Sequence, residues 1–218
     1  MGESGFTQIP SAAAAVVQFA AAPGALATNP STTATAGSNV TNGNLLVVFA
    51  WTSTITSYNT PTGTGACNGI VYTAVGSLSH RMLVWTAPIG STSSCSVTVS
   101  ANTSGQSSMV GIIYELKNVT TTGLLSSYGA TGSCNSCTGQ SITTVSANTL
   151  CIILIAEGGS NTVTSPSPFT FDINQLNTKS DYEGAGNFLQ VSTGTFTPTW
   201  TTTGGPSFDT VSLGFPHS

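Results

Sequence analysis

The chain has 218 residues, of which 39% are hydrophobic and only 5% are charged, against roughly 25% in an ordinary soluble domain. Three Lys and Arg residues against seven Asp and Glu residues give a net charge of −4. Nucleic-acid phosphates and anionic lipids are contacted by clustered cations, and no stretch reaches the roughly 18 apolar residues of a membrane-spanning helix. We therefore expect neither nucleic-acid binding nor membrane insertion.

Hydroxyl side chains dominate the polar composition, since Ser and Thr supply about three residues in ten. Thr favours strands because its branched Cβ suits a pleated surface, whereas Ser and Gly favour turns. The composition therefore predicts an ordered, β-rich protein with a neutral surface. Such a surface offers little charge repulsion between copies, which favours a homo-oligomer or a larger assembly. A monomer solubilised by its hydroxyls is the alternative.

Residues 1–13 are expected to form an N-terminal arm that precedes a single domain over residues 14–218. The apolar segment 11–27 superficially resembles a signal peptide, but no Lys or Arg precedes it, so the positive region of a signal peptide is missing. We interpret residues 15–19 as the first strand. Export would then use lysis, a dedicated system or a signal that this sequence does not contain.

Further strands are predicted wherever a short β-type run lies between turn residues, a pattern typical of sandwiches and barrels. Residues 96–100 and 196–200 alternate between hydroxyl and apolar side chains, which indicates one wet face and one buried face. Pro198 would confine the second of these strands to an edge or a bulge. The predicted strands lie at residues 45–51, 70–75, 81–86, 95–100, 109–116, 124–128, 141–145, 150–156, 169–173, 187–191, 195–200 and 209–215.

Two parts of the sequence resemble each other weakly. Residues 40–50, VTNGNLLVVFA, align with residues 145–155, VSANTLCIILI, and each copy leads to an alternating strand and then to a closing apolar strand. This duplication predicts an all-β fold, an antiparallel two-sheet β-sandwich of the jelly-roll type, in which paired Greek keys share one core. Chance similarity between apolar strands is the alternative.

The order of these motifs is similar to that of a broad group of β-sandwich modules in bacteriophage structural proteins and bacterial extracellular proteins. The similarity extends from residue 15 to residue 216. It implies a virion decoration or surface-assembly protein, or an adhesion module with glycan-binding character, on a virion or an extracellular surface. No catalytic residue is carried over, and the chain departs from the group in its cysteines and low charge. The shared motifs are GNLLVV (43–48), Trp51, VYT (71–73), VWTAP (84–88), SVTV (96–99), YELKNV (114–119), NTL (148–150) and LGF (213–215).

Four of the five cysteines are disulfide candidates. Cys134 and Cys137 form the only Cys-x-x-Cys pair and lie in a Gly/Ser-rich stretch, whereas a redox pair is expected at the start of a helix. We predict a disulfide there, with free thiols as the alternative. Cys67 and Cys95 are a second candidate pair, and Cys151, within an apolar run, is expected to be an inert core thiol. Such disulfides imply maturation outside a reducing cytosol.

No constellation of catalytic or metal-binding residues stands out. A structural zinc site needs four ligands, whereas His80 and His217 are isolated, and no Gly-x-Ser-x-Gly motif is present. The acidic segment 181–183 is interpreted as a solvated loop, with a Ca²⁺ site or paired catalytic carboxylates as alternatives. Glu115 is interpreted as a capping partner of Lys117. We therefore expect no enzymatic activity, metal or cofactor.

An exposed aromatic side chain can provide a platform for a sugar ring. Tyr58, Trp85 and Tyr182 are the candidate glycan contacts, although aromatic residues in β-sandwiches more often pack inside. We therefore predict a non-enzymatic structural or interaction module that makes protein–protein contacts. A carbohydrate-binding adhesin module, with surface glycans as partners, is the alternative.

Overall fold

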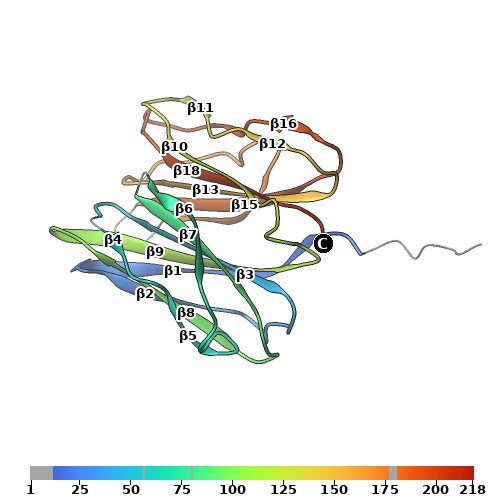
Figure 1. The fold of residues 1–218 in the computed structure, drawn as a ribbon. Coiled ribbons are helices and arrows are strands. Elements are labelled where there is room, and N and C mark those ends of the chain that lie inside the picture. The colour runs from blue at the N-terminus through green and yellow to red at the C-terminus, as the bar shows by residue number, and fades with distance from the viewer. Residues whose placement is uncertain (1–11, 56, 80, 177–180) are drawn as a thin grey trace, which may run out of the picture.

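The computed structural model describes residues 12–55, 57–79, 81–176 and 181–218, and every regular element in these ranges is a β-strand. The strands pair antiparallel (Figure 1). The predicted all-β antiparallel sandwich is therefore confirmed, whereas its jelly-roll form stays a prediction. The described residues contain no helix that could span a membrane.

The first half of the chain folds into a five-stranded sheet and a smaller outer sheet. The five-stranded sheet has the order β1-β9-β3-β7-β6. In the outer sheet, β8 pairs with β2 on one side and with β4 and β5 on the other. The strand bounds are β1 (Ala15–Thr28), β2 (Ser31–Thr35), β3 (Leu45–Thr52), β4 (Ser57–Tyr58), β5 (Thr62–Gly65), β6 (Thr73–Ser79), β7 (Met82–Pro88), β8 (Cys95–Asn102) and β9 (Gln106–Lys117).

The second half repeats this arrangement. Its five-stranded sheet has the order β10-β18-β13-β15-β14, and two short pairs, β11 with β17 and β12 with β16, form its outer layer. The bounds are β10 (Leu125–Ala130), β11 (Ser136–Thr138), β12 (Ile142–Thr144), β13 (Thr149–Glu157), β14 (Thr170–Leu176), β15 (Tyr182–Gln190), β16 (Gly194–Phe196), β17 (Thr199–Thr201) and β18 (Asp209–Phe215).

The strand order of the two large sheets matches position by position along the chain. The segments 40–50 and 145–155, which are similar in sequence, lead into and include most of β3 and β13. Each of these is the central strand of its sheet. The sequence duplication therefore corresponds to a structural repeat.

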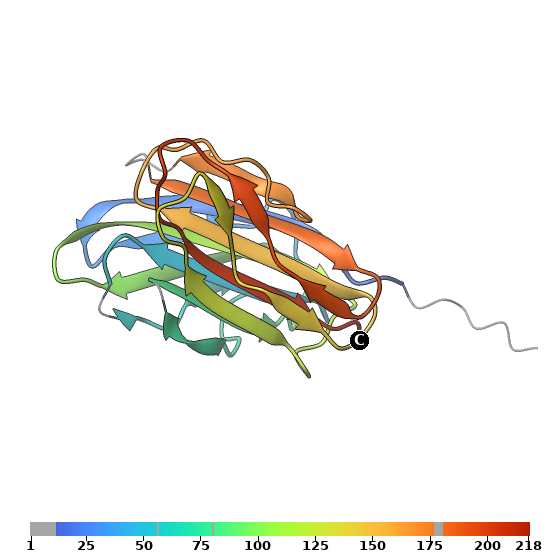
Figure 2. The ribbon, with the colours of Figure 1, turned by 90° about the horizontal axis from the view of Figure 1, so that it is seen from above.

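Three apolar clusters arrange the sheets into four layers, which Figure 1 shows from the side and Figure 2 from above, where they overlap. The two large sheets face each other across a shared core, to which Phe49 and Ile152 belong. A first outer core, with Val48 and Val97, separates the first large sheet from β2 and β8. A second outer core, with Ile153, lies between the second large sheet and its short outer strands.

This layering explains the continuously apolar runs of β3 and β13. Successive side chains of a strand point to opposite faces, so Phe49 enters the shared core and Val48 enters the first outer core. On β13, Ile152 and Ile153 divide in the same way. Both strands are therefore apolar on both faces, whereas the outer strands are apolar on one face only.

The number of layers differs from the expectation of two sheets around one core. The two large sheets are the facing pair, and the smaller outer sheets were not expected. Strands β2, β4, β5 and β11 were not predicted because they are short and carry few large apolar residues. Pro198 ends the predicted strand at residues 195–200, which divides into β16 and β17 on either side of it. The single domain over residues 14–218 stays a prediction.

Candidate interaction surfaces

The outward side of β2, β8 and β5 carries a regular array of hydroxyl groups, here called the first hydroxyl face. Along each strand, outward-pointing hydroxyl residues alternate with residues whose side chains point inward, as the burial pattern of β8 shows. Within the array, Thr33 Oγ1 lies 2.7 Å from Thr98 Oγ1, and Thr35 Oγ1 lies 2.8 Å from Ser96 Oγ. The face consists of Ser31, Thr33, Thr35, Thr62, Thr64, Ser96, Thr98 and Ser100.

A second hydroxyl face lies on the outer strands of the other half, and Figure 1 shows the two sets of outer strands on opposite sides of the molecule. Here Ser141 Oγ lies 2.6 Å from Thr197 Oγ1, and Thr143 Oγ1 lies 2.7 Å from Thr195 Oγ1. This face consists of Ser136, Thr138, Ser141, Thr143, Thr195, Thr197, Thr199 and Thr201.

Hydrogen bonds between neighbouring hydroxyls lower the desolvation cost of burying these faces against a partner. A polar group that loses water without gaining a hydrogen bond is costly to bury. Thr33 and Thr98, like Thr143 and Thr195, already satisfy part of their hydrogen-bonding capacity with each other. Each Thr also presents a methyl group beside its hydroxyl. The faces can therefore be buried against a partner at a lower cost than an array of unpaired polar groups.

Most of the described acidic groups lie inside the protein. Glu115, Glu157, Asp181, Glu183 and Asp209 are all buried. Among the described ranges, Arg81 and Asp172 are partly exposed and the lysine at the end of β9 is exposed, and none of these three belongs to a hydroxyl face. The acidic composition seen in the sequence is therefore not an acidic surface.

Asp209 holds the two halves together at one end of the shared core. Its carboxylate accepts a hydrogen bond of 2.8 Å from Trp51 Nε1 and lies 2.5 Å from an Arg81 nitrogen. The Arg81 guanidinium also lies over the Trp51 ring, 5.5 Å from its centroid. Trp51 and Arg81 belong to the first half and Asp209 to the second, so this charge-assisted cluster fixes their relative position.

The acidic segment 181–183 is not a solvated loop. Asp181 and Glu183 are buried, and Tyr182 begins strand β15. Asp181 accepts a hydrogen bond from Ser108 Oγ of the other half. The interpretation as a loop is therefore wrong, because tertiary contacts outweigh the hydration of an acidic stretch.

Glu115 is also placed differently from the expectation. Its carboxylate is buried and accepts hydrogen bonds from Gln18 Nε2 (2.6 Å), the Thr41 amide (2.8 Å) and Asn44 Nδ2 (2.6 Å). Glu115 therefore joins β1 and the turn before β3 to β9. No sequence signal pointed to this cluster, because its members lie far apart in the chain.

Two of the three candidate glycan contacts lie in the interior, and the third is partly buried. Trp85 is 4% exposed and Tyr182 is 2% exposed. Tyr58 is partly buried, packs edge-on against Trp85 at 5.7 Å and donates its hydroxyl to the Arg81 carbonyl at 2.7 Å. Burial raises the pKa of Tyr58 well above its usual value. These side chains do not form the exposed platform that sugar stacking requires.

Both predicted disulfides are present. Cys67 and Cys95 are joined with a Cα–Cα distance of 5.2 Å, and Cys134 and Cys137 with 5.4 Å. Cys151 is a buried free thiol, and its burial raises the pKa of that thiol to about 12. The disulfides indicate a non-reducing environment.

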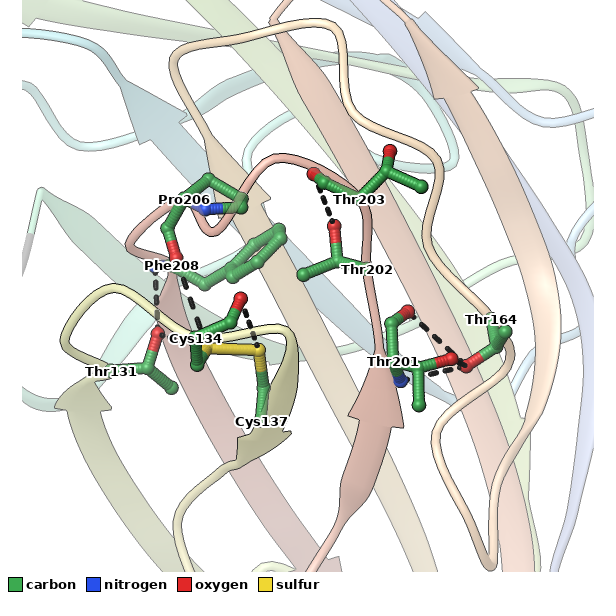
Figure 3. Close-up of a disulfide and its surroundings, with 9 residues drawn as sticks. All are labelled: Thr131, Cys134, Cys137, Thr164, Thr201, Thr202, Thr203, Pro206 and Phe208. Atoms are coloured by element: carbon green, nitrogen blue, oxygen red, sulfur yellow. Dashed lines mark hydrogen bonds between the residues drawn. A yellow bond between two sulfur atoms is a disulfide. The ribbon is translucent and has the colours of Figure 1, made fainter.

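Figure 3 shows how the Cys134–Cys137 loop is attached to the segment just before β18. Thr131 exchanges two hydrogen bonds with Phe208, one of 2.8 Å to its carbonyl and one of 2.9 Å from its amide. The Cys134 amide donates to the Pro206 carbonyl at 3.3 Å. No described helix or basic group adjoins the cysteines, so the geometry fits a structural disulfide.

Two hollows on the described surface have uncharged linings. The larger, with a volume of about 490 Å³, lies between β6 and the start of the second half and is lined by Thr73, Val75, Leu124 and Ser126, among others. The smaller, of about 240 Å³, lies beside Tyr182. Neither lining contains an acid, a base or a cysteine.

The sequence contains two histidines, His80 and His217. His80 lies outside the described residues. His217 Nε2 lies 2.9 Å from the Ala12 carbonyl oxygen near the two chain ends. Within the described ranges, no three His, Cys, Asp or Glu side chains are grouped so that they could hold a metal ion.

Comparisons of the chain with protein-family models, curated proteins and solved structures found no match. The functional argument therefore depends on the surfaces and contacts described above.

Proposed function

We propose that this protein is a non-enzymatic structural module that makes protein–protein contacts in a larger assembly, as a virion decoration or surface-assembly protein does. The observation that carries the proposal is the pair of charge-free hydroxyl faces on opposite sides of the molecule. A working surface without charge is unsuited to nucleic acid or to an anionic membrane. It suits a protein partner that covers it in an assembly.

The burial of the acidic side chains supports the same function. An exposed charge that becomes covered by a partner must lose its water, which is costly unless it is paired. Here the charges are already inside, where Glu115 and Asp209 accept hydrogen bonds from the protein itself. The two disulfides fit a place outside the reducing cytosol, on a virion or a cell surface.

Carbohydrate binding was the alternative function, and no contact in the described residues favours it. Of the aromatic side chains on which it depends, Trp85 and Tyr182 are buried and Tyr58 packs edge-on against Trp85. The hydroxyl faces could donate and accept hydrogen bonds with a sugar, but they lack the aromatic surface that usually supplies most of the contact area.

The proposal is tested by labelling the faces in the native material. Thr33→Cys places a thiol on the first hydroxyl face, and Thr122→Cys places one on the exposed loop between the halves. If the faces are covered, a maleimide reagent labels Thr33→Cys at least about tenfold more slowly in the native material than in dilute purified protein, while Thr122→Cys is labelled equally in both. Equal labelling of Thr33→Cys in the two preparations would overturn the proposal.

A further inference from the structure

We infer that the partner of each hydroxyl face is the same face of a second copy of this chain, so that copies associate into an open linear chain. This inference rests on the proposed function and names its partner. Three features of the faces support it: their hydrogen-bonding chemistry, their lack of charge and their positions on opposite sides of the molecule.

Hydroxyl groups make each face complementary to itself. A Ser or Thr hydroxyl both donates and accepts hydrogen bonds. Thr98 can therefore act as the donor or as the acceptor toward a hydroxyl of another copy. The first hydroxyl face contains no Lys, Arg, Asp, Glu or aromatic residue. It therefore has no feature that would select a charged partner or an apolar anchor, whereas an identical face matches it in hydrogen-bonding chemistry.

The lack of charge removes the usual barrier to contact between identical surfaces. Like charges that meet across an interface cost several kcal/mol, and the net charge of −4 would ordinarily oppose self-association. In this fold the acids lie inside, as Glu157 and Glu183 do. Two copies therefore approach face to face without bringing charges together.

Because the structural repeat gives each copy two hydroxyl faces, copies can be added to the assembly one after another. A contact between identical faces is two-fold symmetric and closes as a dimer. Each copy carries a second hydroxyl face on the opposite side (Figure 1), so a dimer formed through the first faces still exposes both second faces. Contacts of both kinds then alternate, and the assembly has no natural end.

The size of the faces determines the strength of the contacts. The first face spans strands of five to eight residues, β2 and β8, which at about 3.3 Å per residue and 4.8 Å between strands is smaller than the roughly 800 Å² per partner of a standard stable interface. Each contact is therefore weak on its own. Association is expected to depend steeply on protein concentration.

The test uses lysines to block one face at a time. Thr35→Lys with Thr62→Lys places charges on β2 and β5, which flank β8, so the two lysines are not directly opposed. Thr143→Lys with Thr199→Lys places charges on β12 and β17 and so blocks the second hydroxyl face. Each pair is expected to weaken self-association of its face by about 100-fold or more, because like charges would meet across the contact.

Light scattering after size-exclusion chromatography measures the result. Wild-type mass should rise beyond a dimer with concentration, each single-face variant should stop at a dimer, and the variant with both faces blocked should be a monomer. Thr122→Lys, on the loop between the halves, should behave as wild type. Unfolding temperature and intact disulfides show that each variant is folded.

Three results would overturn the inference: a monomeric wild type at every concentration, a single-face variant that assembles as wild type does, or single-face variants that are both monomeric. A monomeric purified protein whose Thr33→Cys thiol is nevertheless shielded in native material would leave the proposed function standing with a different partner. If the Thr33→Cys thiol were not shielded in native material, both the proposed function and this inference would be overturned.

Discussion

The outer layer of the first half is one sheet in which the eight-residue strand β8 pairs with β2, β4 and β5. The corresponding layer of the second half is divided into two short pairs, because Pro198 cannot donate a hydrogen bond in the middle of a strand. The large sheets behind them have the same strand order. The duplicated halves thus agree where both faces of a sheet are buried and differ where one face is exposed.

This difference follows from packing. A strand buried on both faces must keep its register, because a shift by one residue would move every side chain into the wrong core. The outer strands contact a core on one side only, so insertions, a proline and different disulfides are tolerated there. The common feature of the outer layers is the outward hydroxyl pattern, which packing alone does not require.

The largest expected effect separates the shared core from an outer core. Ile152 and Ile153 are adjacent on β13, both are fully buried, and they point into the shared core and the second outer core respectively. Because both side chains are fully buried, changing either to Ala should lower the free energy of unfolding by about 4 kcal/mol. Hydrogen exchange that proceeds by local opening should distinguish them. Ile152→Ala should accelerate it in β3 of the first half more than Ile153→Ala does, because only Ile152 lies in the core shared with β3.

If Ile152→Ala left the exchange of β3 unchanged, the two halves would be independently stable units. In that case the shared core would be an interface between domains, and urea unfolding would show two transitions in place of one.

The disulfides provide the next comparison between the halves. Cys67–Cys95 spans a sequence separation of 28 and Cys134–Cys137 a separation of 3. In the chain-entropy treatment, the longer loop stabilises by about 3.5 kcal/mol and the shorter by about 1.5 kcal/mol. The variant Cys67→Ala/Cys95→Ala should therefore lose more stability in urea than Cys134→Ala/Cys137→Ala, and equal losses would contradict this account.

The smallest effect concerns buried tyrosines at alkaline pH. Burial raises the pKa of Tyr72, in the first half, from 10.0 to about 12. Burial also raises the pKa of Tyr182, in the second half, with further contributions from Glu183 and Glu157. The unfolded chain loses these protons first, so the stabilisation is complete below pH 10 and is lost as the pH rises above it.

Substitution by Phe should remove that pH dependence. The free energy of unfolding, measured between pH 9 and 12, should fall less steeply for Tyr182→Phe than for Tyr72→Phe, and less steeply for both than for wild type. At neutral pH, Tyr72→Phe should cost about 1 kcal/mol for its hydrogen bond to the Cys67 carbonyl. If the free energy of unfolding of Tyr182→Phe fell with pH as steeply as that of wild type, the Tyr182 phenol would be exposed to solvent in the folded protein.

Several features of this protein could be predicted from the sequence because they depend on neighbours along the chain. Alternating and continuous apolar runs indicated the strands, including the central ones at residues 45–51 and 150–156, and the similarity between 40–50 and 145–155 indicated the repeat. The Cys134–Cys137 pair was predicted from its spacing in a loop. Pro198 was correctly expected to disturb its strand.

Other features were decided by the tertiary structure alone. Burial of Asp181 and Glu183, and of the aromatic rings of Trp85 and Tyr182, depends on which sheet covers which face, and local sequence carries no information about that. The same holds for Asp209, whose partners Trp51 and Arg81 lie in the other half. Strand periodicity states that a side chain is on one face or the other, but only the stacking of four layers decides which faces meet solvent.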